Sequence, residues 1–284
     1  MRVLLCIAAL AVAAPAAAAR CSLDWVCVES RESDDGVVLV ARNLKPWPLT
    51  LTAQVTSSNL KARPAAEVTR TVPGGARIEL VNLEVVSPGR PWNYRFNYDW
   101  AVGRNDARHD DDYLYRLPYA GDAAWPVLQG VQTQFSHTGL EAWAVDFDMP
   151  EGSAVHAARE GIAVRVVEEH DRSCWAPGCG RYANFIVILH DDGTTGEYYH
   201  LRHEGAVVEE GQKVRRGQHI GWSGNTGKST MPHLHFAVYR PDTWGRTQSV
   251  AVRFETRSGP LEYPVQGVSY RHPDPASGTN RAAR

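Results

Sequence analysis

Pro232-His233-Leu234-His235-Phe236-Ala237-Val238-Tyr239 is a stretch in which two histidines alternate with apolar residues. Side chains of a β-strand point alternately to its two faces, so a strand here places His233 and His235 on one face. The apolar residues between and after them then face a core. Two imidazoles ~7 Å apart on one face can converge on a single metal ion. Two surface histidines would show the same spacing, so this segment alone predicts a strand and leaves a metal site open.

Two other segments carry polar groups that could complete such a site. Glu197-Tyr198-Tyr199-His200-Leu201 follows the hairpin turn Asp191-Asp192-Gly193, which places His200 at the end of a second strand. Taken singly, His200 is interpreted as a structural histidine. The stretch Ser136-His137-Thr138-Gly139 and the following residues 144–152 supply an imidazole and carboxylates.

Short strands separated by turn residues also dominate the first hundred residues. Residues 92–100 alternate five aromatic side chains with four polar ones, and three further strand-like runs lie between residues 37 and 80. These patterns predict a small antiparallel β-sandwich over residues 20–100. The aromatic face is interpreted as half of a hydrophobic core in preference to a glycan-binding face.

The second part of the chain repeats this pattern without helical periodicity. Residues 101–117 contain clustered Asp and Arg and are predicted to be a linker. Beyond it, Glu151-Gly152-Ser153-Ala154-Val155 is echoed by Glu210-Gly211-Gln212-Lys213-Val214. The echo indicates duplicated hairpins in a β-barrel-like domain over residues 118–256. Residues 257–284 are predicted to be a C-terminal extension with a loose tail. The predicted fold is therefore all-β.

Composition narrows the classes of function. The chain has 284 residues, enough for about two domains, with 43% hydrophobic and 22% charged residues, as in an ordinary globular protein. The 30 Lys and Arg against 32 Asp and Glu give no general electrostatic case for nucleic acid or an anionic membrane. After the first residues, no apolar run is long enough to span a bilayer as an integral membrane segment.

The chain is predicted to begin with a signal peptide, residues 1–19. Residues 3–14 form an apolar run of 12 after a positive start, and residues 16–19 offer small side chains for cleavage. Cleavage near Ala19 would export the protein. A lipoprotein alternative based on Cys21 is disfavoured because Arg20 stands where a lipid-attachment site requires a small residue.

Four cysteines remain after such cleavage, an even number in an oxidising compartment. Proximity in the sequence favours the pairs Cys21–Cys27 and Cys174–Cys179. A thiolate zinc site is the alternative, but neither spacing has the two intervening residues that such sites use.

Together these segments resemble the lysostaphin-type (LytM-like) zinc endopeptidases of bacterial cell walls. The resemblance covers roughly residues 115–256 and consists of five patches in the family's order. They are Gln129-Gly130 with Ser136-His137, then AVDFDMPEGSAVHAAREG, EYYHL, VEEGQKVRRGQHIGWSGNTG and PHLHF.

The resemblance implies zinc-dependent hydrolysis of peptide bonds in peptidoglycan stems or cross-links. The implied zinc ligands are His137, Asp146 and His235. The implied catalytic histidines are His200 and His233. Three protein ligands leave a fourth position for water, which is typical of catalytic rather than structural zinc.

One spacing departs from the family pattern. The first histidine and the aspartate usually stand four positions apart, whereas here they are nine apart. A looped-out turn over residues 139–145, with Gly139 at positive φ and Trp143 packed as an anchor, would bring both to the metal. Glu141 and Asp148 are the fallback oxygen ligands.

Two other functions remain open. A non-catalytic relative could bind or activate other wall hydrolases, and an adhesion or glycan-binding module could use the aromatic N-terminal domain. An exported endopeptidase of the periplasm or cell envelope accounts best for the histidine segments, and zinc content separates it from the other two. The remaining histidines are predicted to be surface or packing residues: His109, His156, His170, His190, His203, His219 and His272.

Overall fold

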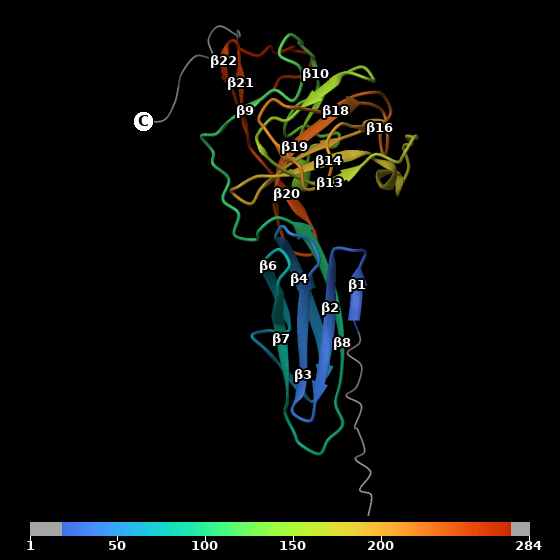
Figure 1. The fold of residues 1–284 in the computed structure, drawn as a ribbon, viewed down its shortest axis with the longest axis vertical. Coiled ribbons are helices and arrows are strands. Elements are labelled where there is room, and N and C mark those ends of the chain that lie inside the picture. Colours follow the sequence, from blue (N-terminus) through green and yellow to red (C-terminus); the bar gives the residue numbers. More distant parts are fainter. Residues whose placement is uncertain (1–18, 274–284) are drawn as a thin grey trace, which may run out of the picture. The chain divides into compact units, whose positions relative to one another are not determined.

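The computed structural model describes residues 19–273. The predicted signal peptide up to residue 18 and the predicted tail from residue 274 lie outside the described residues. The chain divides into two compact units (Figure 1). The first comprises residues 19–46, 53–68 and 72–98 of the described chain, and the second comprises residues 47–52, 69–71 and 99–273. Among residues 19–273, no helix has both the length and the apolar character needed to cross a membrane.

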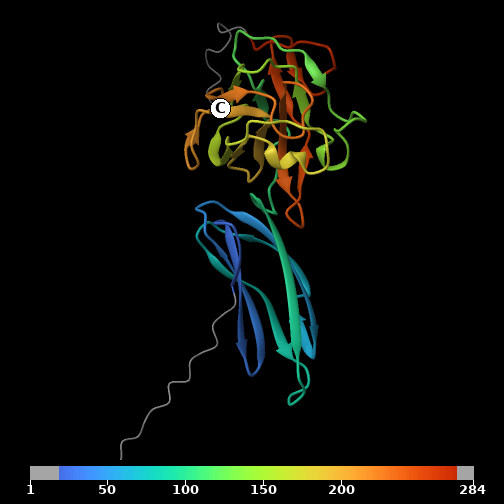
Figure 2. The same cartoon turned by 90° about the vertical axis from the view of Figure 1, so that its right-hand side faces the viewer.

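The N-terminal strands form two sheets. One has the order β1-β2-β3-β7-β5, and the other has the order β6-β4-β8. Figure 2 shows these strands as two layers. The strands are β1 (Ala19–Ser22), β2 (Val26–Ser33), β3 (Gly36–Asn43), β4 (Leu49–Ser58), β5 (Leu60–Arg63), β6 (Glu67–Val72), β7 (Arg77–Val85) and β8 (Asn93–Val102).

Both N-terminal sheets bury apolar side chains, such as Leu39 and Leu83 in the first and Val55 in the second. On β8 the predicted alternation is present: Phe96 is buried, the other aromatic residues are half-buried and the polar ones are exposed. The chain itself covers part of this aromatic face. The Arg20 guanidinium lies 4.8 Å from the centroid of the Phe96 ring. This packing favours the core interpretation of the aromatic stripe.

The second unit is built on an eight-stranded sheet with the order β10-β11-β19-β15-β14-β13-β17, in which β20 pairs with β19. Two three-stranded sheets, β12-β18-β16 and β22-β21-β9, complete it. The strands of the large sheet are β10 (Val127–Gln129), β11 (Val145–Phe147), β13 (Gly161–Val167), β14 (Phe185–Leu189), β15 (Thr195–Tyr199), β17 (Lys213–Val214), β19 (Leu234–Pro241) and β20 (Thr247–Val250).

The smaller sheets contain β9 (Leu114–Arg116), β12 (Ala154–His156), β16 (Leu201–Ala206), β18 (His219–Ser223), β21 (Arg253–Thr256) and β22 (Gly259–Leu261). Two short 3-10 helices, η1 (Gly139–Glu141) and η2 (Cys179–Tyr182), are the helical elements of the described residues. The all-β prediction is confirmed, and within these residues the large sheet does not close into a barrel.

The duplicated motif has a structural counterpart. Gly152 and Gly211 both adopt positive φ, 81° and 88°, at turns that lead into paired strands. After the first turn Val155 pairs with Gly221, and after the second Val214 pairs with Gly161. The same local signal therefore forms two glycine turns, each followed by a strand that pairs with a strand distant in the sequence, so neither connection is a hairpin.

The core of the second unit includes residues from both of its predicted flanks. Tyr115 is fully buried on β9, which runs parallel to β21, so ordered structure begins inside the segment predicted to be a linker. On the other flank, Tyr270 packs against the core, and the buried His272 donates from Nε2 to the Tyr119 carbonyl at 2.9 Å. The disulfides Cys21–Cys27 and Cys174–Cys179 are both present, as predicted.

Candidate metal centre

Asp146 and His235 face each other across two neighbouring strands. They are direct register partners in the antiparallel pair β11–β19. The Nδ1 atom of His235 lies 2.9 Å from the Oδ1 atom of Asp146. Leu234 and Phe236, which flank His235 on β19, are fully buried in the core, as the alternation predicts. The apolar pattern therefore fixes the strand face on which His235 meets Asp146.

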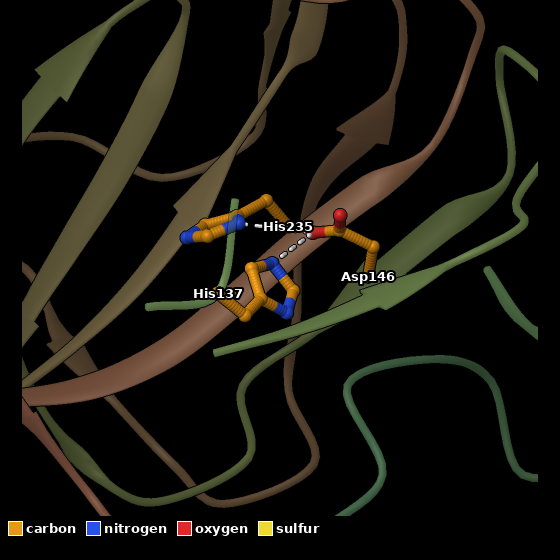
Figure 3. A group of neighbouring side chains, drawn as sticks. All are labelled: His137, Asp146 and His235. Atoms are coloured by element: carbon orange, nitrogen blue, oxygen red, sulfur yellow. Dashed lines mark hydrogen bonds and ion pairs between the residues drawn. The ribbon is translucent and has the colours of Figure 1, made fainter. Parts of the chain in front are cut away.

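His137 reaches the same carboxylate from a loop (Figure 3). Its ring is almost fully buried, with 1% of the residue exposed. Nδ1 lies 2.9 Å from the Gly130 carbonyl, to which it donates a hydrogen bond, and Nε2 lies 3.3 Å from Oδ1 of Asp146. Gln129, at the end of β10, holds the loop through contacts of its amide with the Thr133 and Ser136 hydroxyls at 2.8 and 3.0 Å.

The long spacing between His137 and Asp146 is taken up by a single helical turn. Gly139 begins η1 with φ of 58°, a conformation that costs glycine little. The Trp143 backbone N–H donates to the Ser249 hydroxyl of β20 at 3.0 Å, and the Trp143 ring lies near Tyr263. The extra residues thus leave the sheet, form η1 and return at β11.

These three residues form a group suited to a metal ion. His137, Asp146 and His235 offer ligand atoms that all lie within 4.8 Å of one another, and no other such group occurs in residues 19–273. Because Nδ1 of His137 donates to a carbonyl, Nε2 of the neutral ring carries a lone pair. That atom is buried without a hydrogen-bond partner and faces a carboxylate oxygen. A cation between the nitrogen and the oxygen would satisfy both, so the residues fit a zinc ion.

His200 and His233 lie beside this group and outside it. Their ring centroids are 4.5 Å apart, and Nε2 of His233 is 4.0 Å from Oδ1 of Asp146. Nδ1 of His200 is 2.7 Å from the Thr226 carbonyl, and Nδ1 of His233 is 2.9 Å from the Met231 carbonyl. Each carbonyl accepts the Nδ1 proton, which leaves Nε2 of the neutral ring able to accept another.

The backbone at His200 is unusual. Its φ of 68° lies in the left-handed region, which non-glycine residues rarely occupy, and it stands between the end of β15 and the start of β16. Backbone conformations of this kind cluster at functional sites. At His200 it occurs in a residue whose ring lies beside that of His233.

Burial and the mutual contacts shape the charges of the site. Burial lowers the pKa of His200 to about 3, and His233 and His235 act in the same direction, so His200 is neutral at neutral pH. Burial raises the pKa of the Asp146 carboxyl, but contacts with His137 and His235 outweigh it and hold the pKa below its usual range. Burial lowers the pKa of His235, but the Asp146 carboxylate outweighs burial and raises it.

The group opens into a cleft with an apolar rim. The cavity has a volume of about 550 Å³ and is lined by all five histidine and aspartate residues of the site. Phe135 and Trp175, 74% and 51% exposed, stack at its rim with ring centroids 5.5 Å apart. Trp175 lies within the Cys174–Cys179 disulfide loop, and the Lys228 ammonium is 4.9 Å from its ring centroid.

The fallback oxygen ligands lie outside the group. Asp148 is partly exposed and is not part of it. Glu141 also lies outside it and instead accepts a hydrogen bond from the hydroxyl of Tyr239. No motif in the sequence pointed to Tyr239 as part of the site. The available signal was its position four residues after His235 on the same strand, which puts both side chains on one face.

Most of the other histidines have local partners, as predicted. His109 contacts the Tyr115 hydroxyl and Asp111, and the buried His190 donates from Nδ1 to the Glu160 carbonyl. His203 pairs with the exposed Glu204. None of them belongs to the metal-binding group.

The site and the all-β fold together define a β-protein with a candidate metal centre, and comparison with known proteins identifies the domain that carries it. Residues 141–250 match the family model described as Peptidase family M23. The chain contains a peptidase M23 domain. The matched range includes four of the five site residues, and His137 lies just before it.

Two curated relatives are similar over this domain. The chain is 35% identical to peptidoglycan DD-endopeptidase ShyA of Vibrio cholerae over 124 residues, which is 42% of this chain and 26% of that protein. It is 40% identical to glycyl-glycine endopeptidase ALE-1 of Staphylococcus capitis over 99 residues, 34% of this chain and 24% of the relative. The chain thus spans about a quarter of the length of these relatives. Among solved structures, lysostaphin from Staphylococcus simulans is 31% identical with a TM-score of 0.33, over 44% of this chain and 47% of lysostaphin.

Proposed function

We propose that this protein is an exported zinc endopeptidase that hydrolyses peptide bonds in peptidoglycan stems or cross-links. The observation that carries the proposal is the buried Nε2 atom of His137, which faces the Asp146 carboxylate beside His235 and has no hydrogen-bond partner. His137, Asp146 and His235 would hold the zinc ion. The family match and the names of the relatives support the peptidase activity and its cell-wall substrate.

Zinc, when bound, supplies Lewis acidity toward a substrate carbonyl and lowers the pKa of a water molecule toward 7. The chain's own residues would handle the protons. His200 is neutral at neutral pH, and its Nδ1–H donates to the Thr226 carbonyl, so Nε2 carries the lone pair that would face the water or the substrate. Nδ1 of His233 contacts the Met231 carbonyl, and the His233 ring lies near enough to His200 to share the task.

The cleft would hold the substrate peptide. Its rim offers the apolar side chains of Phe135, Trp175 and Met231, and Lys228 offers a positive charge to a carboxylate. We assign catalysis to residues 118–256 and an accessory role to residues 20–100. The signal-peptide pattern and the two disulfides support export to the periplasm or cell envelope.

Digestion of purified sacculi tests the function directly. Mature protein from zinc-replete medium should contain about one zinc per chain, and mass spectrometry should find newly cleaved peptides. A chelator should stop their release, and added zinc should restore it. Protein that binds zinc but releases no peptides, while stimulating another wall hydrolase, would instead establish the activator function.

A further inference from the structure

The Nδ1 atom of His235 points toward Asp146 in the metal group, whereas its Nε2 atom points toward a hydrogen-bonded pair of side chains that has no role in the proposed chemistry. Nε2 of His235 lies 3.2 Å from the Tyr239 hydroxyl oxygen. That hydroxyl donates to Oε2 of Glu141. Tyr239 is buried on β19, and Glu141 ends the η1 turn. We propose that Tyr239 and Glu141 are positioning residues that orient His235 for zinc, an inference that rests on the proposed function.

The donors and acceptors available in the series His235, Tyr239 and Glu141 fix which atom donates each hydrogen bond. A tyrosine hydroxyl has a single proton, and a carboxylate can only accept. Because the Tyr239 proton goes to Glu141, the Tyr239 oxygen is left as an acceptor for the Nε2 proton of His235. Nδ1, which faces Asp146 at 2.9 Å, is then the nitrogen available to a metal ion. The pair therefore selects the tautomer in which His235 presents Nδ1 to the site.

Both members of the pair are fixed by the surrounding backbone. Tyr239 is a register partner of Thr195 on β15 and of Ser249 on β20. The η1 turn that carries Glu141 is tied to the same β20 strand, since the Trp143 N–H donates to the Ser249 hydroxyl at 3.0 Å. The looped-out segment thus delivers a carboxylate to the far side of a ligand histidine.

This arrangement gives Glu141 a role different from that of a metal ligand. Its Oε2 atom lies 3.8 Å from Nε2 of His235, the nitrogen directed away from Asp146. Its contact with His235 runs through the Tyr239 hydroxyl. Partners that hydrogen-bond a metal-ligating histidine in this way change metal affinity by about 10–100-fold when removed.

A double-mutant cycle tests the proposal on the full mature chain. Zinc affinity is measured by chelator competition for the wild type, Tyr239→Phe, Glu141→Gln and the double variant. The matched control is Tyr199→Phe. Tyr199 stands opposite His235 on β15, but its hydroxyl donates to Glu197 at 3.0 Å instead of contacting His235. Nitrogen-15 NMR of the zinc-loaded protein reports which nitrogen of His235 binds the metal, independently of activity.

We expect Tyr239→Phe to weaken zinc binding about 10–100-fold. Glu141→Gln, which keeps an acceptor for the hydroxyl, should weaken zinc binding less. The double variant should match Tyr239→Phe, because Glu141 acts on His235 through the Tyr239 hydroxyl. Tyr199→Phe should stay within about twofold of the wild type. In the zinc-loaded protein, Tyr239→Phe should also change the Nε2 resonance of His235.

Three results would overturn the inference. Tyr239→Phe could bind zinc as the wild type does, the two effects could be additive, or Glu141→Gln alone could empty the site as a lost ligand would. Circular dichroism and thermal unfolding exclude misfolding, and Glu141 is exposed enough to be replaced without opening the core. Failure of the proposed function is a separate outcome, because the wild type would then bind no zinc or release no peptides.

Discussion

Two pairs of neighbouring strands in the second unit each bring a histidine opposite another titratable residue. On β11 and β19, His235 faces Asp146, and on β12 and β18, His156 faces His219 with ring centroids 5.4 Å apart. The second pair is satisfied by the backbone: His156 Nδ1 bonds the Gly217 carbonyl and His219 Nε2 bonds the Gly221 carbonyl. Two adjacent imidazoles therefore do not make a metal site. A buried carboxylate and a nitrogen without a partner distinguish the first location from the second.

The largest expected effect separates the two locations directly. His235→Ala removes a proposed ligand, so zinc content should fall from about one per chain to near zero. Cleavage of sacculi should fall by at least ~10³-fold, since a bound metal lowers the activation barrier by several kcal/mol. Elemental analysis and product release measure both quantities. His156→Ala is the matched control and should keep its zinc and its activity. Equal zinc loss in the two variants would show that the two strand pairs do not differ in metal binding.

The next test concerns the histidines beside the metal group. His200→Ala and His233→Ala should each retain zinc and lose about 10²–10⁴-fold in cleavage rate, because proton transfer is impaired while the three proposed ligands remain. Zinc content and rate are measured on the same preparations. The assignment of roles would be contradicted by variants that lose zinc together with activity.

A smaller effect is expected at the rim of the cleft. Trp175→Ala removes the stacking partner of Phe135 and should raise KM by up to about tenfold with little change in kcat, in keeping with about 0.5–1.5 kcal/mol for an aromatic pair. Steady-state cleavage of soluble wall peptides measures both constants. Val207→Ala, an exposed apolar residue that does not line the cavity, is the control. A fall in kcat at constant KM would show that the rim does not act through substrate binding.

The contrast between the two strand pairs also shows what the sequence could predict. The alternation around His235 fixed its strand face, because Leu234 and Phe236 must enter the core. Local patterns also predicted the turn at Gly139 and both disulfides. Each of these features depends on residues close together in the chain.

Features that depend on distant pairing were beyond such patterns. Tyr115 was assigned to a linker, yet it is buried because β9 pairs with β21, more than a hundred residues later. Likewise, Glu141 was considered as an oxygen ligand, whereas the tether of the η1 turn to β20 brings it to Tyr239. No local signal shows which strand a turn will meet.

The smallest effect at neutral pH concerns histidines that are buried for packing alone. Burial lowers the pKa of His190 to about 4 and also that of His272 to about 4, below the 6.5 expected in the unfolded chain. Between pH 6.5 and 4 the unfolded state therefore binds more protons than the folded state. The free energy of unfolding should fall as the pH falls through this window, with a slope approaching ~1.4 kcal/mol per pH unit for each histidine.

Replacement of one of these histidines isolates its contribution to the pH dependence of the free energy of unfolding. His190→Asn should unfold in urea with a weaker dependence on pH between 6.5 and 4 than the wild type, because one of the histidines whose pKa burial lowers no longer titrates. His203→Asn, in which an exposed histidine is replaced, is the matched control. At pH 7.5 both histidines are neutral in either state, so their titration contributes nothing to stability there. An unchanged slope in His190→Asn would mean that His190 takes up its proton without unfolding, and it would then differ from the packing histidines with which it is grouped here.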